Sequence, residues 1–327
     1  MEDALMLVSF SLILLLPLSL IFFLSLIVRP HPMKVPIKGR HVFITGGSSG
    51  IGLELAKRAA IEGARVSILA RNQKKLEDAK DSIRLATGID VSIFSADVRD
   101  MESVRKAIDE AGPIDVLICN QGFFVARELV NQDLEEVKFI IDVNLIGTFH
   151  LIKAALPGMK ARRDKRPVSI AIMSSQAGQV GIYGYSAYSA SKFGLRGMAE
   201  VLQQELIAYN IHITLIYPPD TNTPGLVEQN KTRPALTSII AASSGAMESA
   251  KVAKISMDGI KSAKFNVFCN FEGWMLGVVC AGLSPQRSYI MAFFEVVFAS
   301  ILRLVGLCFQ WNWYQTILKW HAKNINN

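Results

Sequence analysis

The sequence has few of the residues that build metal centres and disulfide-stapled folds. Its 327 residues include 4 cysteines and 5 histidines, and the histidines form no cluster. The cysteines lie in apolar runs without metal-ligand or redox spacing, at Cys119, Cys269, Cys280 and Cys308. This pattern argues against a metal site and a structural disulfide, and it indicates a reducing compartment.

Charged residues are also scarce, at 19% of the chain. The formal net charge is +7, but the basic residues are dispersed and form no stripe with interleaved aromatic residues. The sequence therefore does not favour a nucleic-acid interface. A dispersed positive excess is compatible with an anionic membrane surface.

Residues 4–28 carry no charge, and Pro17 is their one interruption. As a helix they reach about 37 Å, more than the roughly 30 Å hydrocarbon core of a bilayer. A cleavable signal peptide would begin with basic residues, whereas only Glu2 and Asp3 precede this run. We expect a retained anchor. The basic residues after it predict a lumenal N-terminus and a cytosolic remainder; they are Arg29, Lys34, Lys38 and Arg40.

Apolar residues gather again near the C-terminus, with all four tryptophans in residues 274–320. Residues 273–283 are short for a span, and residues 289–309 contain Glu295 and Arg303. A charge at the centre of a span costs about 2.5–3.5 kcal/mol. Tryptophans near segment ends are typical of an interfacial belt. A membrane hairpin, helices on the membrane surface and a soluble helix pair all stay open.

The sequence predicts three parts: an anchor with its basic flank at 1–37, one α/β domain at 38–271, and a membrane-associated tail at 272–327. Strands are expected at 40–45, 64–70, 90–95, 114–120, 168–174, 211–217 and 265–270, and helices at 53–62, 101–111, about 133–159 and 248–261. This alternation predicts a Rossmann-type, doubly wound parallel sheet of about seven strands. Residues 226–245 have weak periodicity, as expected of a flexible lid over a substrate.

A glycine-rich turn at residues 45–52, Thr-Gly-Gly-Ser-Ser-Gly-Ile-Gly, joins the first expected strand to the next helix. Glycines let a pyrophosphate approach the backbone, and a helix N-terminus offers unpaired N–H groups. The placement predicts a dinucleotide-binding loop, with a plain capping turn as the alternative. Its candidate residues are Gly46, Ser48, Ser49, Gly50, Ile51 and Gly52.

No acid ends the second strand, where a carboxylate would bind the adenosine ribose. Arg71 stands there, with Lys74 and Lys75 behind it. Because a guanidinium suits a 2′-phosphate, we expect NADPH rather than NADH. Further cofactor candidates follow the third and fourth strands: Asp97 and Val98, with Asp97 able to bond the adenine amino group, then Asn120 and Gly122 around Gln121.

A serine, a tyrosine and a lysine form the chemical candidate. Tyr188 and Lys192 are four residues apart and so share one helix face, and Ser175 lies thirteen residues before Tyr188. A nearby ammonium favours ionisation of a phenol, whose ordinary pKa is about 10. With Ser175 bonded to a carbonyl oxygen and Tyr188 protonating it, the three suit carbonyl reduction. Asn144 lies inside an expected helix, either as a solvated residue or as a built-in kink.

These motifs together resemble the short-chain dehydrogenase/reductase family over about residues 38–271. The resemblance implies that Tyr188 donates the proton, that Lys192 lowers the pKa of Tyr188 and binds the nicotinamide ribose, and that Ser175 orients the carbonyl. It also implies that Asn144 holds a water of a proton relay. Homo-oligomers are common in such families. Further nicotinamide contacts are implied at Pro218, Thr221 and Thr223.

Two departures from the family pattern stand out. The usual Asn-Ala-Gly is Asn-Gln-Gly at 120–122, and the usual Pro-Gly is Pro218-Pro219, which leaves the contacts of Thr221 and Thr223 open.

Four short segments also resemble a membrane-bound branch of the family; they are residues 174–179, 218–225, 270–273 and 284–287. The branch resemblance implies NADPH-dependent reduction of the 3-keto group of a long-chain sphingoid base at the cytosolic face of the endoplasmic reticulum membrane. Steroid, retinoid or 3-ketoacyl-CoA reduction and a non-catalytic scaffold are the alternatives.

Overall fold

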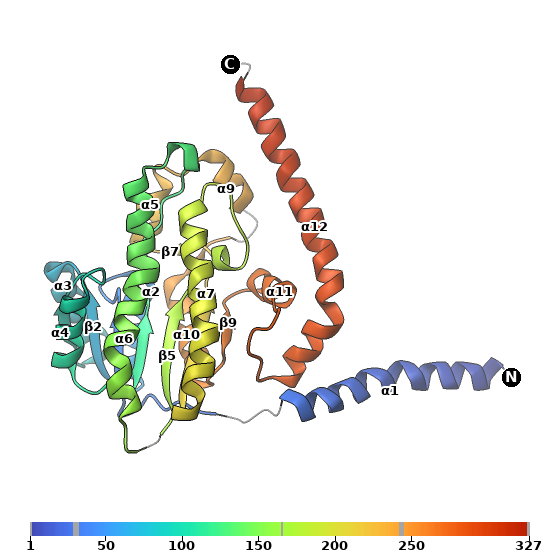
Figure 1. Cartoon of the computed structure of the whole chain (residues 1–327), viewed down its shortest axis with the longest axis horizontal. Helices are drawn as coiled ribbons and strands as arrows, with labels where there is room; N and C mark the ends of the chain where they lie inside the picture. The colour runs from blue at the N-terminus through green and yellow to red at the C-terminus, as the bar shows by residue number, and fades with distance from the viewer. Residues whose placement is uncertain (1, 29–32, 165, 242–244, 326–327) are drawn as a thin grey trace.

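A parallel sheet forms the centre of the computed structural model, which describes residues 2–28, 33–164, 166–241 and 245–325 (Figure 1). The strands of the sheet are β1 (His41–Thr45), β2 (Arg65–Ala70), β3 (Ser92–Ser95), β4 (Val116–Cys119), β5 (Val168–Met173), β6 (Ile211–Tyr217) and β9 (Asn266–Phe268). They lie in the order β3-β2-β1-β4-β5-β6-β9, and every neighbouring pair is parallel. A separate two-stranded pair joins β7 (Thr221–Asn222) to β8 (Met247–Glu248). The predicted doubly wound sheet is confirmed.

Helices cover both faces of the sheet. One face carries α2 (Gly50–Ile61), α3 (Gln73–Thr87) and α10 (Ser249–Lys261). The other carries α4 (Met101–Ala111), α5 (Leu134–Ile141), α6 (Gly147–Lys160) and α7 (Ser186–Leu206). Short 3₁₀ turns lie at Leu129–Asn131, Gln176–Gly178 and Ile207–Tyr209.

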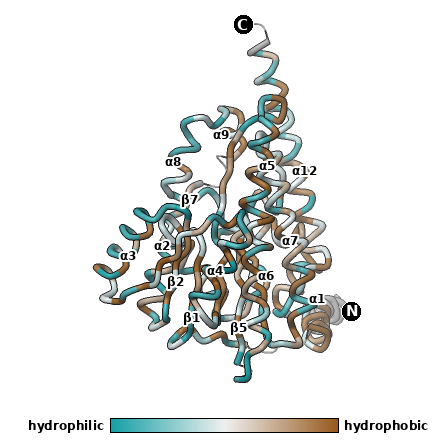
Figure 2. The backbone as a smooth tube through the Cα atoms, turned by 60° about the vertical axis from the view of Figure 1, so that its left-hand side comes forward, coloured by the Kyte–Doolittle hydropathy of each residue, from teal (hydrophilic) through white to brown (hydrophobic). Residues whose placement is uncertain are grey.

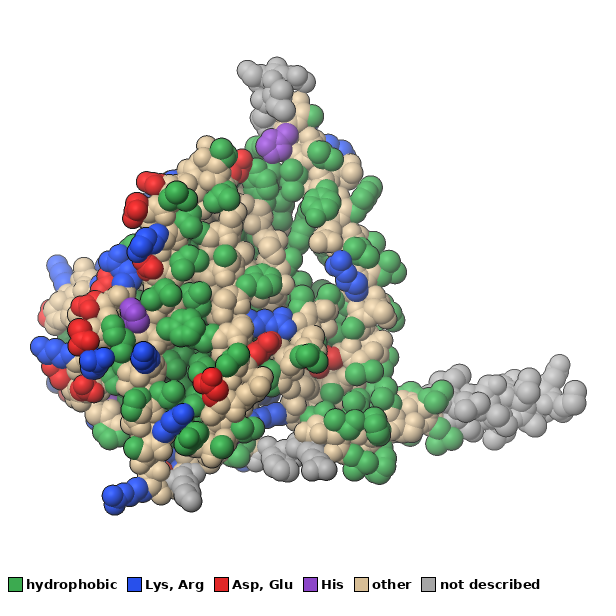
Figure 3. Space-filling view, in the orientation of Figure 1, with side chains coloured by type: hydrophobic (Ala, Val, Ile, Leu, Met, Phe, Trp, Pro, Cys, Tyr) green, Lys and Arg blue, Asp and Glu red, His purple; other side chains and the backbone are tan. Residues whose placement is uncertain are grey.

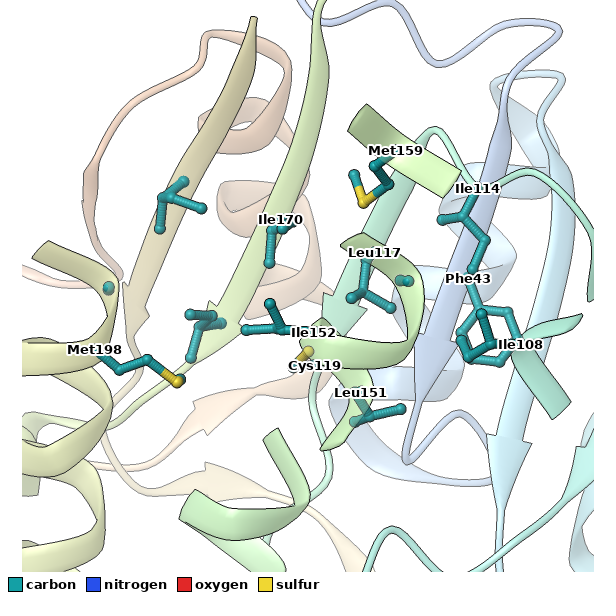
Figure 4. Close-up of a cluster of buried hydrophobic side chains, with 14 of the residues drawn as sticks. Phe43, Ile108, Ile114, Leu117, Cys119, Leu151, Ile152, Met159, Ile170 and Met198 are labelled. Carbon is teal, nitrogen blue, oxygen red and sulfur yellow. The ribbon is translucent and has the colours of Figure 1, made fainter. Parts of the chain in front are cut away.

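Apolar strand residues build a core on each side of the sheet. On the α6 side, Phe43, Leu117 and Ile170 from the strands lie with Leu151 and Ile152 of α6 (Figure 4), and these side chains are at most 4% exposed. Burial of each such side chain contributes about 1.5–3 kcal/mol. The chain trace is accordingly brown along the strands and teal on outer helices such as α3 (Figure 2). This packing holds the carboxyl ends of the strands in fixed positions.

The expected continuous helix at 133–159 is interrupted. A π-helical segment, Asp142–Ile146, separates α5 from α6, and Asn144 at its middle is fully buried. Asparagine side chains compete with helical backbone bonds, and π-turns often mark functional sites. Of the two alternatives for Asn144, the solvated residue is wrong, and a π-helical break in the α-helix lies at this position.

Helices replace the irregular segment expected at 226–245, as far as that segment is described. They are α8 (Pro224–Asn230) and α9 (Ala235–Ala241). Thr223 caps α8 by accepting a hydrogen bond from the Leu226 N–H at 3.1 Å, and Pro224 occupies the first turn. Both are strong helix-starting signals, so local capping prevails over the weak hydrophobic periodicity.

The terminal helices lie beside the sheet domain. They are α1 (Glu2–Val28), α11 (Phe271–Val279) and α12 (Tyr289–Ile325). α12 packs against α1, α9 and α11, while α1 points away from the body (Figure 1). Because α11 begins at residue 271, the domain boundary predicted after that residue falls inside this helix. On the face shown in Figure 3, hydrophobic side chains gather over α12 and the described end of α1, and charged ones over α3 and α4.

Two stretches within the described residues have the length and hydropathy of a membrane span. In residues 134–160, 44% of the most apolar 18-residue window is buried, and this stretch covers the sheet as a core helix does. Residues 289–323 of α12 are only 6% buried. In α1, the described side chains of Leu15–Val28 form a shorter apolar stretch with Phe22 66% exposed. These exposed apolar helices are compatible with membrane association.

Candidate active site

A cavity of about 1050 Å³ runs from the glycine-rich turn, past the carboxyl ends of the strands, to α11 and α12. It is large even for ligand pockets, which usually measure about 300–1,000 Å³, and can hold a cofactor and a substrate together. The predicted site residues on its wall are Gly46, Ser48, Ser49, Gly50, Ile51, Arg71, Lys75, Asp97, Val98, Asn120, Gly122, Ser175, Tyr188, Lys192, Pro218, Thr221 and Thr223. The predicted residues Gly52 and Asn144 lie behind that wall.

The glycine-rich turn has the backbone that a dinucleotide cradle requires. Gly46 and Gly50 have φ of +63° and +54°, a region that favours glycine. A Cβ on Gly52 would collide with the carbonyl oxygen of Gly46, and one on Gly50 would lie 2.9 Å from Thr223 Cγ2. The turn leads into the N-terminus of α2, whose N–H groups suit phosphate. These residues fit a nicotinamide dinucleotide.

Asn120 and Gln121 fasten this turn to the rest of the site. The Asn120 side chain donates to the carbonyl oxygens of Thr45 and Gly46 at 3.2 and 3.4 Å. Thr45 Oγ1 donates to Gln121 Oε1 at 2.5 Å, and Gln121 Nε2 donates to Thr148 Oγ1 at 2.9 Å. The unusual glutamine thus joins the end of β1 to α6, two contacts that alanine could not make.

At the far end of the turn, Arg71 and Lys75 line the cavity. Arg71 is exposed, and its guanidinium lies 5.7 Å from the ring centre of Phe139. Asp97 is held by Arg99, with 2.7 Å between Oδ2 and Nη2, and this hydrogen bonding lowers the pKa of the Asp97 carboxyl. Two cationic side chains, Arg71 and Lys75, thus line this part of the cavity with a single carboxylate, Asp97, which is already paired. This excess of positive charge suits a ribose that carries a 2′-phosphate.

The structure separates the two adjacent serines, Ser174 and Ser175. Ser174 is 2% exposed, and its Oγ donates to the backbone carbonyl of Lys192 at 3.2 Å. Ser175 is partly exposed, and its Oγ accepts from the Ala177 N–H at 3.2 Å. The influence of its hydroxyl on Tyr188 lowers the pKa of that phenol. Ser175 is therefore the serine available to a carbonyl group.

Lys192 is buried beside Tyr188. Its Nζ lies 5.6 Å from the Tyr188 ring centre and donates to the Met173 carbonyl at 2.8 Å. Desolvation lowers the pKa of Lys192 to about 7 and raises that of Tyr188 to about 12. Burial is the largest cause of the raised pKa of Tyr188, and the expected lowering of that pKa by Lys192 stays a prediction. Tyr188 keeps its proton at neutral pH, as a proton donor must.

Asn144 supports the site from behind. Its Nδ2 donates to the Phe123 carbonyl and to Ser191 Oγ, at 2.8 and 2.9 Å, and its Oδ1 accepts from the Phe123 N–H at 2.8 Å. The side chain therefore clamps the segment after Gly122 to α7, the helix of Tyr188. The proposed water relay stays a prediction.

Two aromatic residues near Tyr188 were not anticipated. The rings of Phe124 and Tyr185 lie 5.3 and 5.5 Å from that of Tyr188, and both residues line the cavity. Tyr185 is the N-cap residue of α7 and precedes Tyr188 by three residues, a spacing that was available in the sequence. The cavity walls from α11 and α12 were also not anticipated, because they depend on how the tail packs.

Comparison with known proteins agrees with this geometry. Residues 40–234 match the short chain dehydrogenase family. The chain is 65% identical, over 90% of both chains, to 3-dehydrosphinganine reductase TSC10A from Arabidopsis thaliana. It is 34% identical, over 88% of both chains, to 3-ketodihydrosphingosine reductase from Bos taurus. A short-chain dehydrogenase from Sphingobium yanoikuyae in complex with NADPH shares the fold, with a TM-score of 0.62 and 24% identity over 70% of this chain and 87% of that one. The chain therefore belongs to the short chain dehydrogenase family.

Proposed function

We propose that the protein reduces 3-dehydrosphinganine (3-ketodihydrosphingosine) to sphinganine (dihydrosphingosine) with NADPH, a step of sphingolipid biosynthesis. The observation that carries the proposal is the meeting of Ser175, Tyr188 and Lys192 in one cavity with a dinucleotide cradle. High identity over most of the chain to two Arabidopsis thaliana 3-dehydrosphinganine reductases, 65% and 61%, supports the substrate.

The chain's own residues would act on the ketone oxygen. Ser175 donates a hydrogen bond to that oxygen, and Tyr188 transfers its phenolic proton to it. The resulting phenolate is stabilised by the Lys192 ammonium and by the Ser175 hydroxyl. A bound reduced nicotinamide supplies the hydride. The Lys192 ammonium would then return a proton to the Tyr188 phenolate, and Asn144 would hold the water through which the neutral Lys192 amine takes up a proton from solvent.

A nicotinamide dinucleotide is the cofactor class of the family, and we propose NADPH as the member used. Arg71 and Lys75 stand where a ribose-binding acid would otherwise be, and they would bind the 2′-phosphate. Asp97 and Val98 would border the adenine. Pro218, Thr221 and Thr223 would border the nicotinamide, because they line the cavity after β6.

We further propose that the protein is held in the endoplasmic reticulum membrane with its catalytic domain in the cytosol. The apolar residues 4–28, the basic residues after them and the exposed apolar side chains of α12 support this location. Exposed Phe149 and Val201 on the outer helix layer support a homo-oligomer paired through that layer.

The test is NADPH oxidation by the detergent-solubilised full chain with 3-dehydrosphinganine, beside a 3-ketoacyl-CoA, a ketosteroid and retinal. We expect turnover of the sphingoid ketone and its loss in Tyr188→Phe. Turnover of another substrate alone would contradict the substrate assignment and keep the chemistry. No turnover of any substrate would favour a non-catalytic scaffold.

A further inference from the structure

The wall of the cavity formed by α11 has one polar end. Glu272, Met275, Leu276 and Val279 line the cavity, and their spacing puts them on one helix face. A carboxylate thus stands at the start of a stripe that is otherwise apolar. Such a stripe matches a ligand with a cation at one end and a hydrocarbon chain behind it.

The start of α11 is fastened to the catalytic turn. Gln176, the residue after Ser175, donates from Nε2 to Asn270 Oδ1 at 2.6 Å, and Gln179 Nε2 donates to the Gly273 carbonyl at 3.1 Å. Glu272 lies between these two anchor points. Its carboxylate is therefore carried by the element that adjoins the proposed carbonyl site.

Glu272 differs from the other carboxylates on the cavity wall. Asp97 is paired with Arg99 at 2.7 Å, and Asp220 with the buried Arg233 at 2.6 Å. The described residues give Glu272 neither a hydrogen bond nor an ion pair, although it is partly buried. A partly buried carboxylate without a protein partner is available to a cationic ligand.

The nearest cation of α12 does not fill this role. Arg303 lines the cavity from α12, but no ion pair joins it to Glu272 among the described residues.

The opposite wall is a stripe of α12: Leu302, Gly306, Phe309 and Trp313, spaced by four, three and four residues. A Cβ on Gly306 would meet no atom within 4 Å, so the helix borders open space there. Figure 3 shows a hollow between α12 and the body. The stripes of α11 and α12 thus form two walls of one mainly apolar channel, in which Arg303 and Gln310 are the polar residues of α12.

We propose that Glu272 binds the amino group of a 2-amino-3-ketone substrate while its alkyl chain lies between α11 and α12, with room set by Gly306. The inference rests on the proposed function. In such a substrate the ammonium group is attached to the carbon next to the ketone. A ketone oxygen bonded to Ser175 and Tyr188 therefore brings the cation toward the catalytic end of α11, and the chain continues along the apolar stripe.

The first experiment compares 3-dehydrosphinganine with the 2-deamino ketone of equal chain length. We expect Glu272→Gln to raise KM for the aminoketone about 10- to 100-fold, the range of a charge-assisted hydrogen bond, and to leave the deamino ketone unchanged. Glu228→Gln is the matched control, because Glu228 is 69% exposed on α8 and outside the cavity wall. If Glu272→Gln raised KM equally for both ketones, or for neither, the proposed role of Glu272 would be refuted.

The second experiment varies chain length. Gly306→Leu should lower kcat/KM for an 18-carbon base at least tenfold and spare an 8-carbon one, whereas Leu304→Phe, on the outer side of α12, should change neither. If Gly306→Leu lowered kcat/KM for both chain lengths, or for neither, the proposed alkyl channel would be refuted. A wild-type chain that reduces no aminoketone would instead refute the proposed function.

Discussion

Gln176 Nε2 and Asn270 Oδ1 lie 2.6 Å apart and join the turn that follows Ser175 to the start of α11. The same Asn270 oxygen accepts from the Gly273 N–H at 2.9 Å and so caps the helix. These residues come from two segments of the branch resemblance, 174–179 and 270–273, which are far apart in sequence. Their contact couples the catalytic serine to the helix that lines the substrate end of the cavity.

Gln176→Ala should loosen this connection. Its removal leaves Asn270 without one partner, which for a partly buried group costs about 1–3 kcal/mol. We expect a lower free energy of unfolding and a higher KM for substrate, with the KM for NADPH unchanged. A double-mutant cycle with Asn270→Ala, followed by denaturant unfolding, measures the coupling. Strict additivity of the two changes would show that the contact is not energetically linked.

The two serines make a matched pair for mutation. Ser175→Ala should reduce kcat about 10²- to 10³-fold, the effect of losing one donor to a developing oxyanion. Ser174→Ala removes a bond to the Lys192 carbonyl and should act on thermal stability more than on kcat. Steady-state kinetics with both variants gives the comparison. A larger kcat loss in Ser174→Ala would reverse the assignment.

Local patterns were sufficient to predict the sheet and to select cofactor candidates that line one cavity. Each strand is a short apolar run next to a turn, and the glycine loop, Asn120 and Tyr188 act through their own backbone or one helix face. The limits of α4 and β6 agree with the predicted residues. Choosing Ser175 over Ser174 from sequence depended on family spacing; the structure adds burial as the physical reason.

Long-range packing was not predictable in the same way. The bond between Gln176 and Asn270 joins residues 94 positions apart. The apolar tail could be recognised as membrane-associated, but its pattern does not say that one face of α12 closes the catalytic cavity. The pKa of Lys192 likewise depends on burial that no spacing reveals.

Arg71 should decide between the two nicotinamide cofactors. Arg71→Ala removes a cation that would bind the 2′-phosphate, so KM for NADPH should rise about tenfold or more while KM for NADH changes little. Lys74→Ala is the control, because Lys74 lies outside the cavity wall. Initial rates with each cofactor are the measurement. An equal effect of Arg71→Ala on both cofactors would contradict the phosphate role.

The titration of Lys192 should make the free energy of unfolding depend on pH. Its folded pKa is lowered from 10.5 to about 7, so between these values the folded chain binds fewer protons than the unfolded chain. The free energy of unfolding attributable to Lys192 therefore rises with pH through this window. The variant Lys192→Met has no titrating group at this position, so it lacks the gain in stability that the wild type shows as the pH rises. The Tm of the variant, measured relative to that of the wild type, should therefore fall steadily from pH 7 to pH 10. A difference in Tm independent of pH would show that the ammonium is not desolvated.

Asn230 reports on which side of the membrane the domain lies. Asn230-Lys231-Thr232 is a glycosylation sequon, and Asn230 is exposed at the end of α8. A lumenal domain would offer this asparagine to the glycosylation machinery, whereas a cytosolic one never meets it. The natural chain expressed in eukaryotic cells should therefore show no mass shift on glycosidase treatment. A variant with residues 1–28 replaced by a cleavable signal peptide is the positive control, because it carries the same exposed sequon into the lumen. A glycan on Asn230 of the natural chain would reverse the orientation drawn from the basic residues after the anchor.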